Sequence, residues 1–358
     1  MSATIAIAGA GLAGRLFAWA LARAGHRVQV FDARPGPEPL FDGQGAAAFT
    51  AAGLLSPLAE LEKAEAPIAA AGWRSLALWP EVVRALSQRQ PVGLQLQGSL
   101  LLAQRSDAGA AQRVLDRLQQ PGLEAFPQPQ ALDPQALAAL EPALRRSPGL
   151  LAWHLPGEGL IHPLEAMAAL HADAPQAAWH WEQPVAQCDA RQLRLADGRC
   201  IDADWVVDCR GLGAKAQLPG LRGVRGEVIA LDAPGHGLTR AVRLLHPRHR
   251  VYLVPRTADQ LLIGASEIES EDRSPVSLQS AVELMAAAHS VMPQLAEARI
   301  LRLDRNLRPA FADHQPLLHR EPGLLRLNGM YRHGWLLAPA LVDQLLRDSG
   351  LGALPAPR

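Results

Sequence analysis

Three glycines near the N-terminus have the spacing of a loop that binds a diphosphate. Gly9 ends an apolar strand and allows a tight turn, Gly11 lets the backbone approach a pyrophosphate, and Gly14 lets the next helix pack closely on the strand. The start of that helix adds free N–H groups and the positive end of a dipole. We therefore expect a dinucleotide to be bound by Gly9, Ala10, Gly11, Leu12, Ala13 and Gly14.

An acidic residue ends the second expected strand, 18 residues after Gly14. The carboxylate of Asp32 is placed to accept hydrogen bonds from a ribose 2′-hydroxyl, which is free in FAD and NAD but not in NADP. We expect the ribose end of the cofactor to meet Asp32, Ala33 and Arg34. This first segment therefore predicts FAD or NAD.

A second glycine-bracketed turn, from Gly329 to Pro339, favours FAD over NAD. It opens a helix whose N-terminal N–H groups can face the N1–C2=O edge of a flavin and stabilise the reduced, anionic ring. An ordinary helix cap is the alternative. The predicted contacts in this turn are Gly329, Tyr331, Arg332, His333, Gly334, Trp335 and Leu336, and Val185 and Gly211 are further candidates.

The elements that must hold these turns are of two kinds. Apolar strands alternate with alanine-rich helices over residues 4–80, which is typical of a layer of parallel strands. The chain between 223 and 305 is instead predicted to form successive strands at 226–231, 241–245, 250–255 and 260–265, with a helix over 277–290. Near the C-terminus a strand over 324–329 and a helix over 338–347 are expected.

The predicted fold class is α/β, with a discontinuous Rossmann-like FAD-binding domain, because the two α/β signals lie at opposite ends of the chain. A second, α+β substrate domain is expected on a mainly antiparallel sheet. We assign residues 1–80, 150–222 and 306–358 to the FAD-binding domain, and residues 81–149 and 223–305 to the substrate-binding domain.

The amino-acid composition limits the classes of binding partner and the compartment expected for this protein. The 358 residues carry 35 basic and 35 acidic side chains, without a basic block, so nucleic acid is not expected as a partner. The three cysteines, Cys188, Cys200 and Cys209, lack metal-site spacing and indicate free thiols in a reducing compartment. No apolar stretch reaches the roughly 20 residues of a membrane span. We expect a cytoplasmic enzyme with no metal site, which could form a homo-oligomer.

Five segments together resemble the FAD-dependent D-amino-acid oxidase superfamily, and within it the glycine oxidase branch associated with thiamine biosynthesis. They are the glycine turn at 9–14, Thr50-Ala51-Ala52-Gly53-Leu54, Val224-Arg225-Gly226-Glu227, Tyr252 to Arg256 with Ile263 to Ser266, and Leu307-Arg308-Pro309 with the 329–339 turn. The resemblance implies FAD, contacts to it from residues 50–54, and oxidation of an amine carbon next to a carboxylate. No His or Cys stands in a flavin-linking position, so we expect the FAD to be bound non-covalently. Ala48, Phe49, His333 and Trp335 depart from residues that are common in relatives.

Three side chains are the candidates for the chemistry. The planar guanidinium of Arg308 can grip a carboxylate at two points, which a lysine cannot reproduce, and the resemblance places it at the carboxylate-binding position. The hydroxyl of Tyr252 could bond the same carboxylate. Arg332 lies in the flavin turn and could contact substrate through its side chain or its carbonyl oxygen. These groups would orient the substrate so that its Cα–H faces the flavin.

The sequence leaves open the role of several acidic residues and the identity of the electron acceptor. Glu60, Glu62 and Glu65 are expected on a solvated helical face, although one of them could border the active site. Glu267 could select a cationic substrate or pair with an arginine. The leading function is oxidation of glycine, sarcosine or a D-amino acid to an imine, with O2 reduced to H2O2. The alternatives are a dehydrogenase with another electron acceptor and a flavoprotein subunit of a complex.

Overall fold

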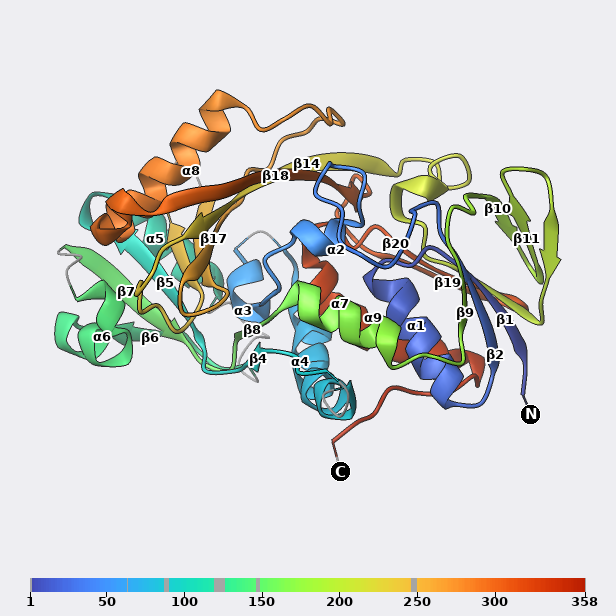
Figure 1. The fold of residues 1–358 in the computed structure, drawn as a ribbon. Helices are drawn as coiled ribbons and strands as arrows, with labels where there is room; N and C mark the ends of the chain where they lie inside the picture. Colours follow the sequence, from blue (N-terminus) through green and yellow to red (C-terminus); the bar gives the residue numbers. More distant parts are fainter. Residues whose placement is uncertain are drawn as a thin grey trace.

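The computed structural model describes residues 2–62, 64–86, 90–118, 126–145, 149–245 and 250–357. Two large sheets dominate it (Figure 1). The first has six strands, in the order β19 (Leu317–Glu321), β20 (Leu324–Asn328), β13 (Trp205–Asp208), β1 (Thr4–Ala8), β2 (Arg27–Phe31) and β9 (Ala178–His180). All neighbouring strands run parallel except β19 and β20. Segments from both ends and the middle of the chain therefore build one sheet.

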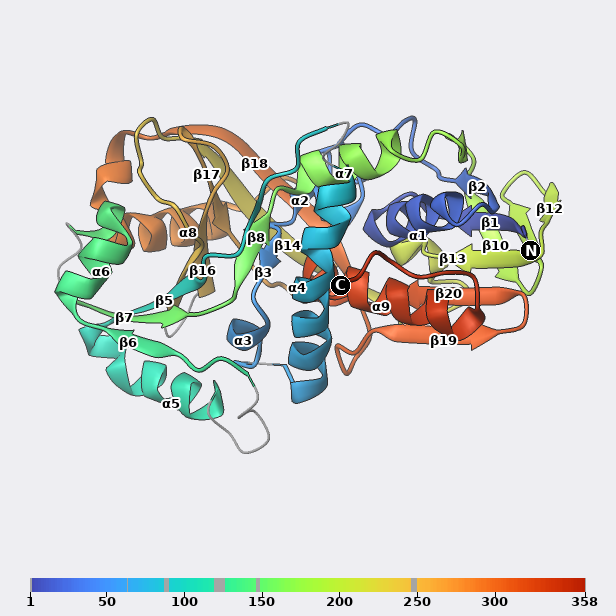
Figure 2. The same cartoon turned by 90° about the horizontal axis from the view of Figure 1, so that it is seen from below.

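Helices α1 (Leu12–Arg23) and α9 (Gly334–Ser349) pack on one face of the six-stranded sheet, and α4 (Ala66–Leu86) and α7 (Pro163–Ala172) pack against these two helices (Figure 2). Ile5 and Ile7 of β1 point into this layer, where Trp19 and Trp79 are also fully buried. The opposite face packs on a small antiparallel sheet of β10 (Val185–Asp189), β11 (Gln192–Leu195) and β12 (Cys200–Asp202). Burial on both faces explains the continuous apolar strands.

The second large sheet has eight strands, β18 (Arg299–Ala310), β14 (Arg222–Asp232), β17 (Gln260–Gly264), β16 (Arg250–Pro255), β15 (Val242–Leu245), β5 (Ser99–Gln104), β7 (Leu150–Leu155) and β6 (Gln130–Leu132). Only β15 and β5 pair in parallel. Helix α8 (Leu278–Val291) covers its outer face, and α5 (Ala108–Leu118) and α6 (Pro134–Leu140) flank it. The expected mainly antiparallel sheet is thus confirmed.

Short elements connect the two sheets near the centre of the molecule. They are α2 (Ala47–Thr50), α3 (Pro57–Glu60), the three strands β3 (Leu54–Leu55), β8 (Gly159–Ile161) and β4 (Leu94–Gln95), and the 3-10 turn η5 (Tyr331–His333). The other 3-10 turns adjoin longer elements: η1 (Arg105–Asp107) precedes α5, η2 (Pro142–Leu144) follows α6, η3 (Gly211–Ala214) follows β13, and η4 (Pro293–Glu297) follows α8. Strand β7 lies within the range predicted for the FAD-binding domain but pairs in the eight-stranded sheet. The division into domains otherwise stays a prediction.

Helix α9 begins at Gly334, four residues earlier than the sequence predicts, and it contains Pro339. Proline has no N–H, so the carbonyl oxygen four residues before it, on Trp335, has no helical donor. The indole Nε1 of Trp79, on α4, donates to that oxygen at 3.1 Å. A partner on a neighbouring helix therefore lets α9 continue through the proline. No helix in the described ranges is long and apolar enough to cross a bilayer.

Candidate active site

One cavity of about 1120 Å³ extends from the glycine turn to the start of α9. Both large sheets contribute to its walls. The predicted site residues that line it are Gly9, Gly11, Leu12, Ala13, Asp32, Ala33, Arg34, Thr50, Ala51, Ala52, Gly53, Leu54, Val185, Gly211, Tyr252, Arg308, Gly329, Tyr331, Arg332, His333, Gly334, Trp335 and Leu336. Ala10 and Gly14 do not line it. The structure thus brings nearly all the predicted residues to one cavity.

The glycine turn is built by close backbone packing between β1 and α1. Gly9 has a φ of +96°, a conformation that side chains disfavour. A Cβ on Gly14 would overlap the carbonyl oxygen of Gly9. Around Gly11, in contrast, the nearest atom to an added Cβ is 3.9 Å away, on Ala46. Gly14 therefore holds the helix against the turn, whereas Gly11 leaves room for a ligand at the backbone.

Asp32 lies at the end of β2, and its carboxylate is held by two neighbouring segments. It accepts hydrogen bonds from the backbone N–H of Ala10 at 2.5 Å and from Arg34 Nε at 2.8 Å. Burial alone would raise the pKa of Asp32, but the bonds from Arg34 and Ala10 outweigh it and lower the pKa. The Nη1 atom of Arg34 is buried and has no hydrogen-bond partner among the described residues. An unpaired donor on the cavity wall fits a polar cofactor group there.

The far end of the cavity meets the N-terminus of α9. No side chain caps this helix, so its first N–H groups remain available. A Cβ placed on Gly334 would meet no atom within 4 Å. The cavity thus joins a phosphate-sized backbone turn, an acidic strand end and an uncapped helix, which are the parts needed by an extended dinucleotide such as FAD.

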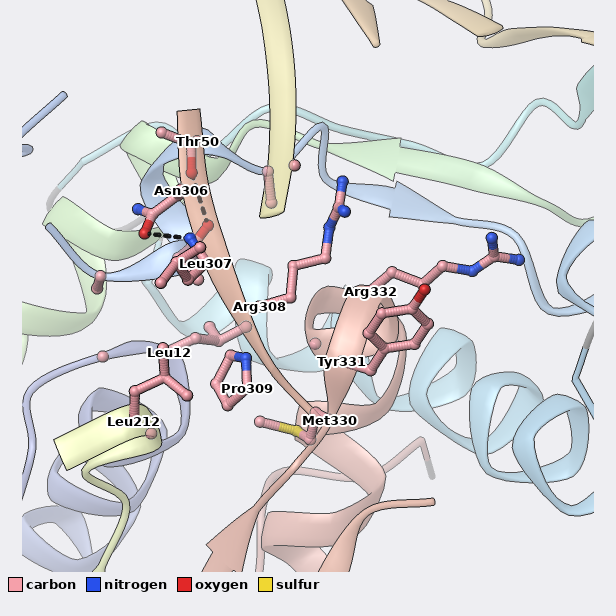
Figure 3. Close-up of a pocket in the computed structure, with 18 of the residues that line it drawn as sticks. Leu12, Thr50, Leu212, Asn306, Leu307, Arg308, Pro309, Met330, Tyr331 and Arg332 are labelled. Carbon is pink, nitrogen blue, oxygen red and sulfur yellow. Dashed lines mark hydrogen bonds between the residues drawn. The ribbon is translucent and has the colours of Figure 1, made fainter. Parts of the chain in front are cut away.

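Arg308 extends from β18 into the cavity (Figure 3). Its guanidinium crosses the neighbouring strand β14 over Gly226, where a Cβ would overlap it. The Nη1 atom donates to the backbone carbonyl oxygens of Ser266 at 3.1 Å and Arg225 at 3.4 Å. No carboxylate in the described part of the chain pairs with Arg308. Its charge therefore remains available for an anionic ligand.

Tyr252 lies close to Arg308 on β16, with its ring over Gly264 of β17. A Cβ at Gly264 would be 2.6 Å from the tyrosine hydroxyl, so this glycine makes room for the ring. Burial raises the pKa of Tyr252 and keeps the phenol protonated at neutral pH. Tyr252 can therefore act as a hydrogen-bond donor beside Arg308.

Glu60 is buried, contrary to the expected solvated face, because three basic side chains surround it. Its Oε1 accepts a hydrogen bond from Arg243 Nη2 at 2.7 Å. Its Oε2 lies 2.7 Å from Arg332 Nη2 and 3.2 Å from His333 Nδ1. Burial alone would raise the pKa of Glu60, but Arg332, Arg243 and His333 together hold it well below its usual range. Glu60 is therefore ionised at neutral pH.

Arg332 is also paired on its other side. Its Nη1 donates to Glu267 Oε2 at 3.1 Å, which is the arginine pairing expected as one of the two roles of Glu267. In Figure 3, Arg332 and Tyr331 approach the cavity from the turn before α9, away from the strand that carries Arg308. Burial raises the pKa of Tyr331. The two predicted arginines thus differ, since Arg332 has carboxylate partners and Arg308 has none among the described residues.

Two of the unusual residues contact each other. The indole Nε1 of Trp335 donates to the carbonyl oxygen of Ala48 at 3.1 Å, and its ring stacks on Trp79. Phe49 is buried beside the guanidinium of Arg34, 5.8 Å from its ring centre. The sequence did not predict Gly226, Gly264 or Arg243 as parts of the site, and it indicated Glu60 only as one of three acidic residues that could border it. The two glycines lie inside the motifs that support the family resemblance, whereas no local sequence pattern distinguishes Glu60 or Arg243 as a site residue.

Residues 4–345 match the DAO family model, described as FAD dependent oxidoreductase. A protein of Rhizobium etli named as a thiamine biosynthesis oxidoreductase is 38% identical over 96% of this chain and 95% of its own. The crystal structure of glycine oxidase from Geobacillus kaustophilus superposes with a TM-score of 0.80 at 27% identity, covering 97% and 94% of the two chains. That of iminodiacetate oxidase from Chelativorans sp. gives 0.77 at 25%, covering 99% and 96%.

Proposed function

The chain belongs to the DAO family of FAD-dependent oxidoreductases, and on this premise we propose that it oxidises a small amino acid to an imine. The substrate is glycine, sarcosine or a D-amino acid, the electron acceptor is O2, and the reduced product is H2O2. The turn at 329–339 predicts FAD as the cofactor. When FAD is bound, it accepts the two electrons of this oxidation. The supporting relatives are named for oxidation of glycine and of iminodiacetate, which both carry an amine beside a carboxylate.

One observation carries the proposal, namely that Arg308 faces the cavity without a carboxylate partner in the described chain. A half-buried guanidinium such as that of Arg308 is stabilised by a bidentate carboxylate, so the site favours a ligand that brings one. Tyr252 is positioned to donate to the same carboxylate. A substrate held at two points presents its Cα in one orientation, which is what hydride transfer requires.

Arg332 takes a different part in this proposal. Its guanidinium is already paired with Glu60 and Glu267, so its side chain does not compete for the substrate carboxylate. We assign the contact with the substrate amine to its backbone carbonyl oxygen, which can accept a hydrogen bond from the neutral amine. Together these groups orient an amino acid and leave little acid–base work to side chains.

The test compares Arg308→Lys and Arg308→Ala with glycine and with its decarboxylated analogue, methylamine. Both variants are expected to lower kcat/KM for glycine by about a hundredfold, because Lys keeps the charge but not the two-point grip. Turnover of methylamine, poor in the wild type, is expected to change little. Arg299→Ala, on the exposed part of the same strand, is the matched control.

Two results would contradict the proposal. One is a methylamine turnover better than that of glycine in the wild type, and the other is normal glycine turnover by Arg308→Ala. Oxygen consumption and dye reduction are measured in parallel. Good dye reduction without oxygen consumption would identify a dehydrogenase in place of an oxidase.

A further inference from the structure

Two other arginines lie with Arg308 at the end of the cavity near the start of α9. Arg243 comes from β15 and Arg332 from the turn before α9, and both line the same cavity. Either guanidinium could bind a carboxylate if its charge were exposed. The Nε atom of Arg243 is buried and has no hydrogen-bond partner among the described residues. The cavity therefore contains more arginine side chains than are needed to bind the single carboxylate of a substrate.

The carboxylate of Glu60 suppresses this extra capacity. It lies 2.7 Å from a nitrogen of each arginine, with one oxygen toward Arg243 and the other toward Arg332. Glu267 adds a second carboxylate on the outer side of Arg332, at 3.1 Å. Two arginines thus face two carboxylates, and the positive charge of Arg308 is left over. The two pairs made by Glu60 are strong at these distances, because water is largely excluded from its carboxylate.

We propose that Glu60 is a specificity-determining residue, which leaves Arg308 as the one of these three arginines without a carboxylate partner among the described residues, and so as the carboxylate anchor. The inference rests on the proposed function, since it assumes that Arg308 binds the substrate carboxylate. It restricts the substrate to amino acids with one carboxylate and disfavours dicarboxylates. It also prevents a reversed pose, in which the carboxylate would lie at Arg332 and the Cα–H would turn away from the reacting position.

The experiment measures acetate binding to the FAD-loaded protein by calorimetry in four forms, the wild type, Arg308→Ala, Glu60→Gln and the double variant. Acetate is expected to bind the wild type and to bind Arg308→Ala at least about tenfold more weakly, the loss expected for one charge-assisted hydrogen bond. In the double variant, Arg243 loses its carboxylate partner and Arg332 keeps only Glu267. Acetate affinity is then expected to recover by about tenfold relative to Arg308→Ala.

The two proposals fail in different ways. If Arg308→Ala binds acetate as tightly as the wild type, the anchor itself is wrong and the proposed function loses its support. If Arg308→Ala loses acetate and the double variant does not regain it, Glu60 has no role in selectivity. A dicarboxylate gives a second readout, because malonate is expected to inhibit Glu60→Gln about tenfold more strongly than the wild type.

Two further variants serve as a substitute for Glu60→Gln and as a control for it. Should Glu60→Gln not fold, Glu267→Gln replaces it, since its side chain is 30% exposed and it pairs with the same arginine. The matched control is Glu269→Gln, two residues along, whose carboxylate is 60% exposed and pairs with Arg222. Combined with Arg308→Ala, it is expected to leave acetate binding lost. Recovery in this control would mean that any nearby charge change produces the effect, and it would overturn the assignment to Glu60.

Discussion

The two ends of the cavity are built in different ways. The glycine-turn end is formed mainly by the backbone of residues 9–34, against which residues 209–210 pack at Gly9, and its charged pair lies two residues apart at Asp32 and Arg34. The other end joins side chains from α3, β15, β16, β18 and the turn before α9. Cofactor binding therefore depends on local backbone geometry, whereas substrate choice depends on charges assembled from distant segments. Mutations can separate the two.

A matched pair of glycines gives the strongest test of this difference. A Cβ on Gly14 would overlap backbone, which cannot move without shifting α1 against β1. We expect Gly14→Ala to lower the free energy of unfolding by about 3 kcal/mol and to prevent FAD retention. Thermal unfolding and flavin absorbance after gel filtration measure both effects. A stable variant that retains its flavin would show that the turn tolerates the shift.

Gly226→Ala is the counterpart at the substrate end. Here an added Cβ would overlap the tip of the Arg308 side chain, which can move. We expect kcat/KM for glycine to fall by roughly a hundredfold through misplacement of the guanidinium, with little change in FAD affinity. Steady-state kinetics and FAD titration of the apoprotein check this. Equal losses in FAD affinity would show that the two ends are not separable.

Asp32→Ala removes the carboxylate at the glycine-turn end of the cavity and tests its contribution to FAD binding. Losing a charged acceptor for the ribose is expected to weaken FAD binding by roughly 1.5–3 kcal/mol, or about ten- to a hundredfold. Turnover at saturating FAD is expected to stay near the wild-type value, because Asp32 lies at the opposite end of the cavity from Arg308. Fluorescence titration with FAD gives the affinity. A fall in saturated turnover with unchanged affinity would assign Asp32 a different role.

The smallest expected effect is on acid stability. The pKa of Glu60 is lowered in the folded state, so its contribution to stability is complete above its ordinary value of 4.5 and is lost as the pH falls below it. The stability of the wild type is therefore expected to fall more steeply below pH 4.5 than that of Glu60→Gln. Denaturant unfolding at several pH values between 6 and 3 compares the slopes. Parallel curves would mean that the ionised form of Glu60 has no net advantage in the fold.

The same contrast explains how far the sequence could be interpreted. The glycine turn, Asp32 and the uncapped helix at Gly334 are local patterns, and the fold class followed from them. The burial of Glu60 was missed because its partners lie on β15 and in the turn before α9, and no spacing connects residues 60, 243 and 332. The early start of α9 was missed for a similar reason, since it is Trp79, on another helix, that donates to the carbonyl oxygen that Pro339 leaves without a helical donor.

The central claim is that the cavity presents an amino acid to the bound flavin by its carboxylate. The most direct measurement is anaerobic mixing of the FAD-loaded protein with glycine, sarcosine, D-alanine and methylamine, followed by flavin absorbance. The account predicts that at least one of the amino acids bleaches the flavin rapidly and that methylamine does so far more slowly. Bleaching by methylamine alone, or by none of the four compounds, would contradict it.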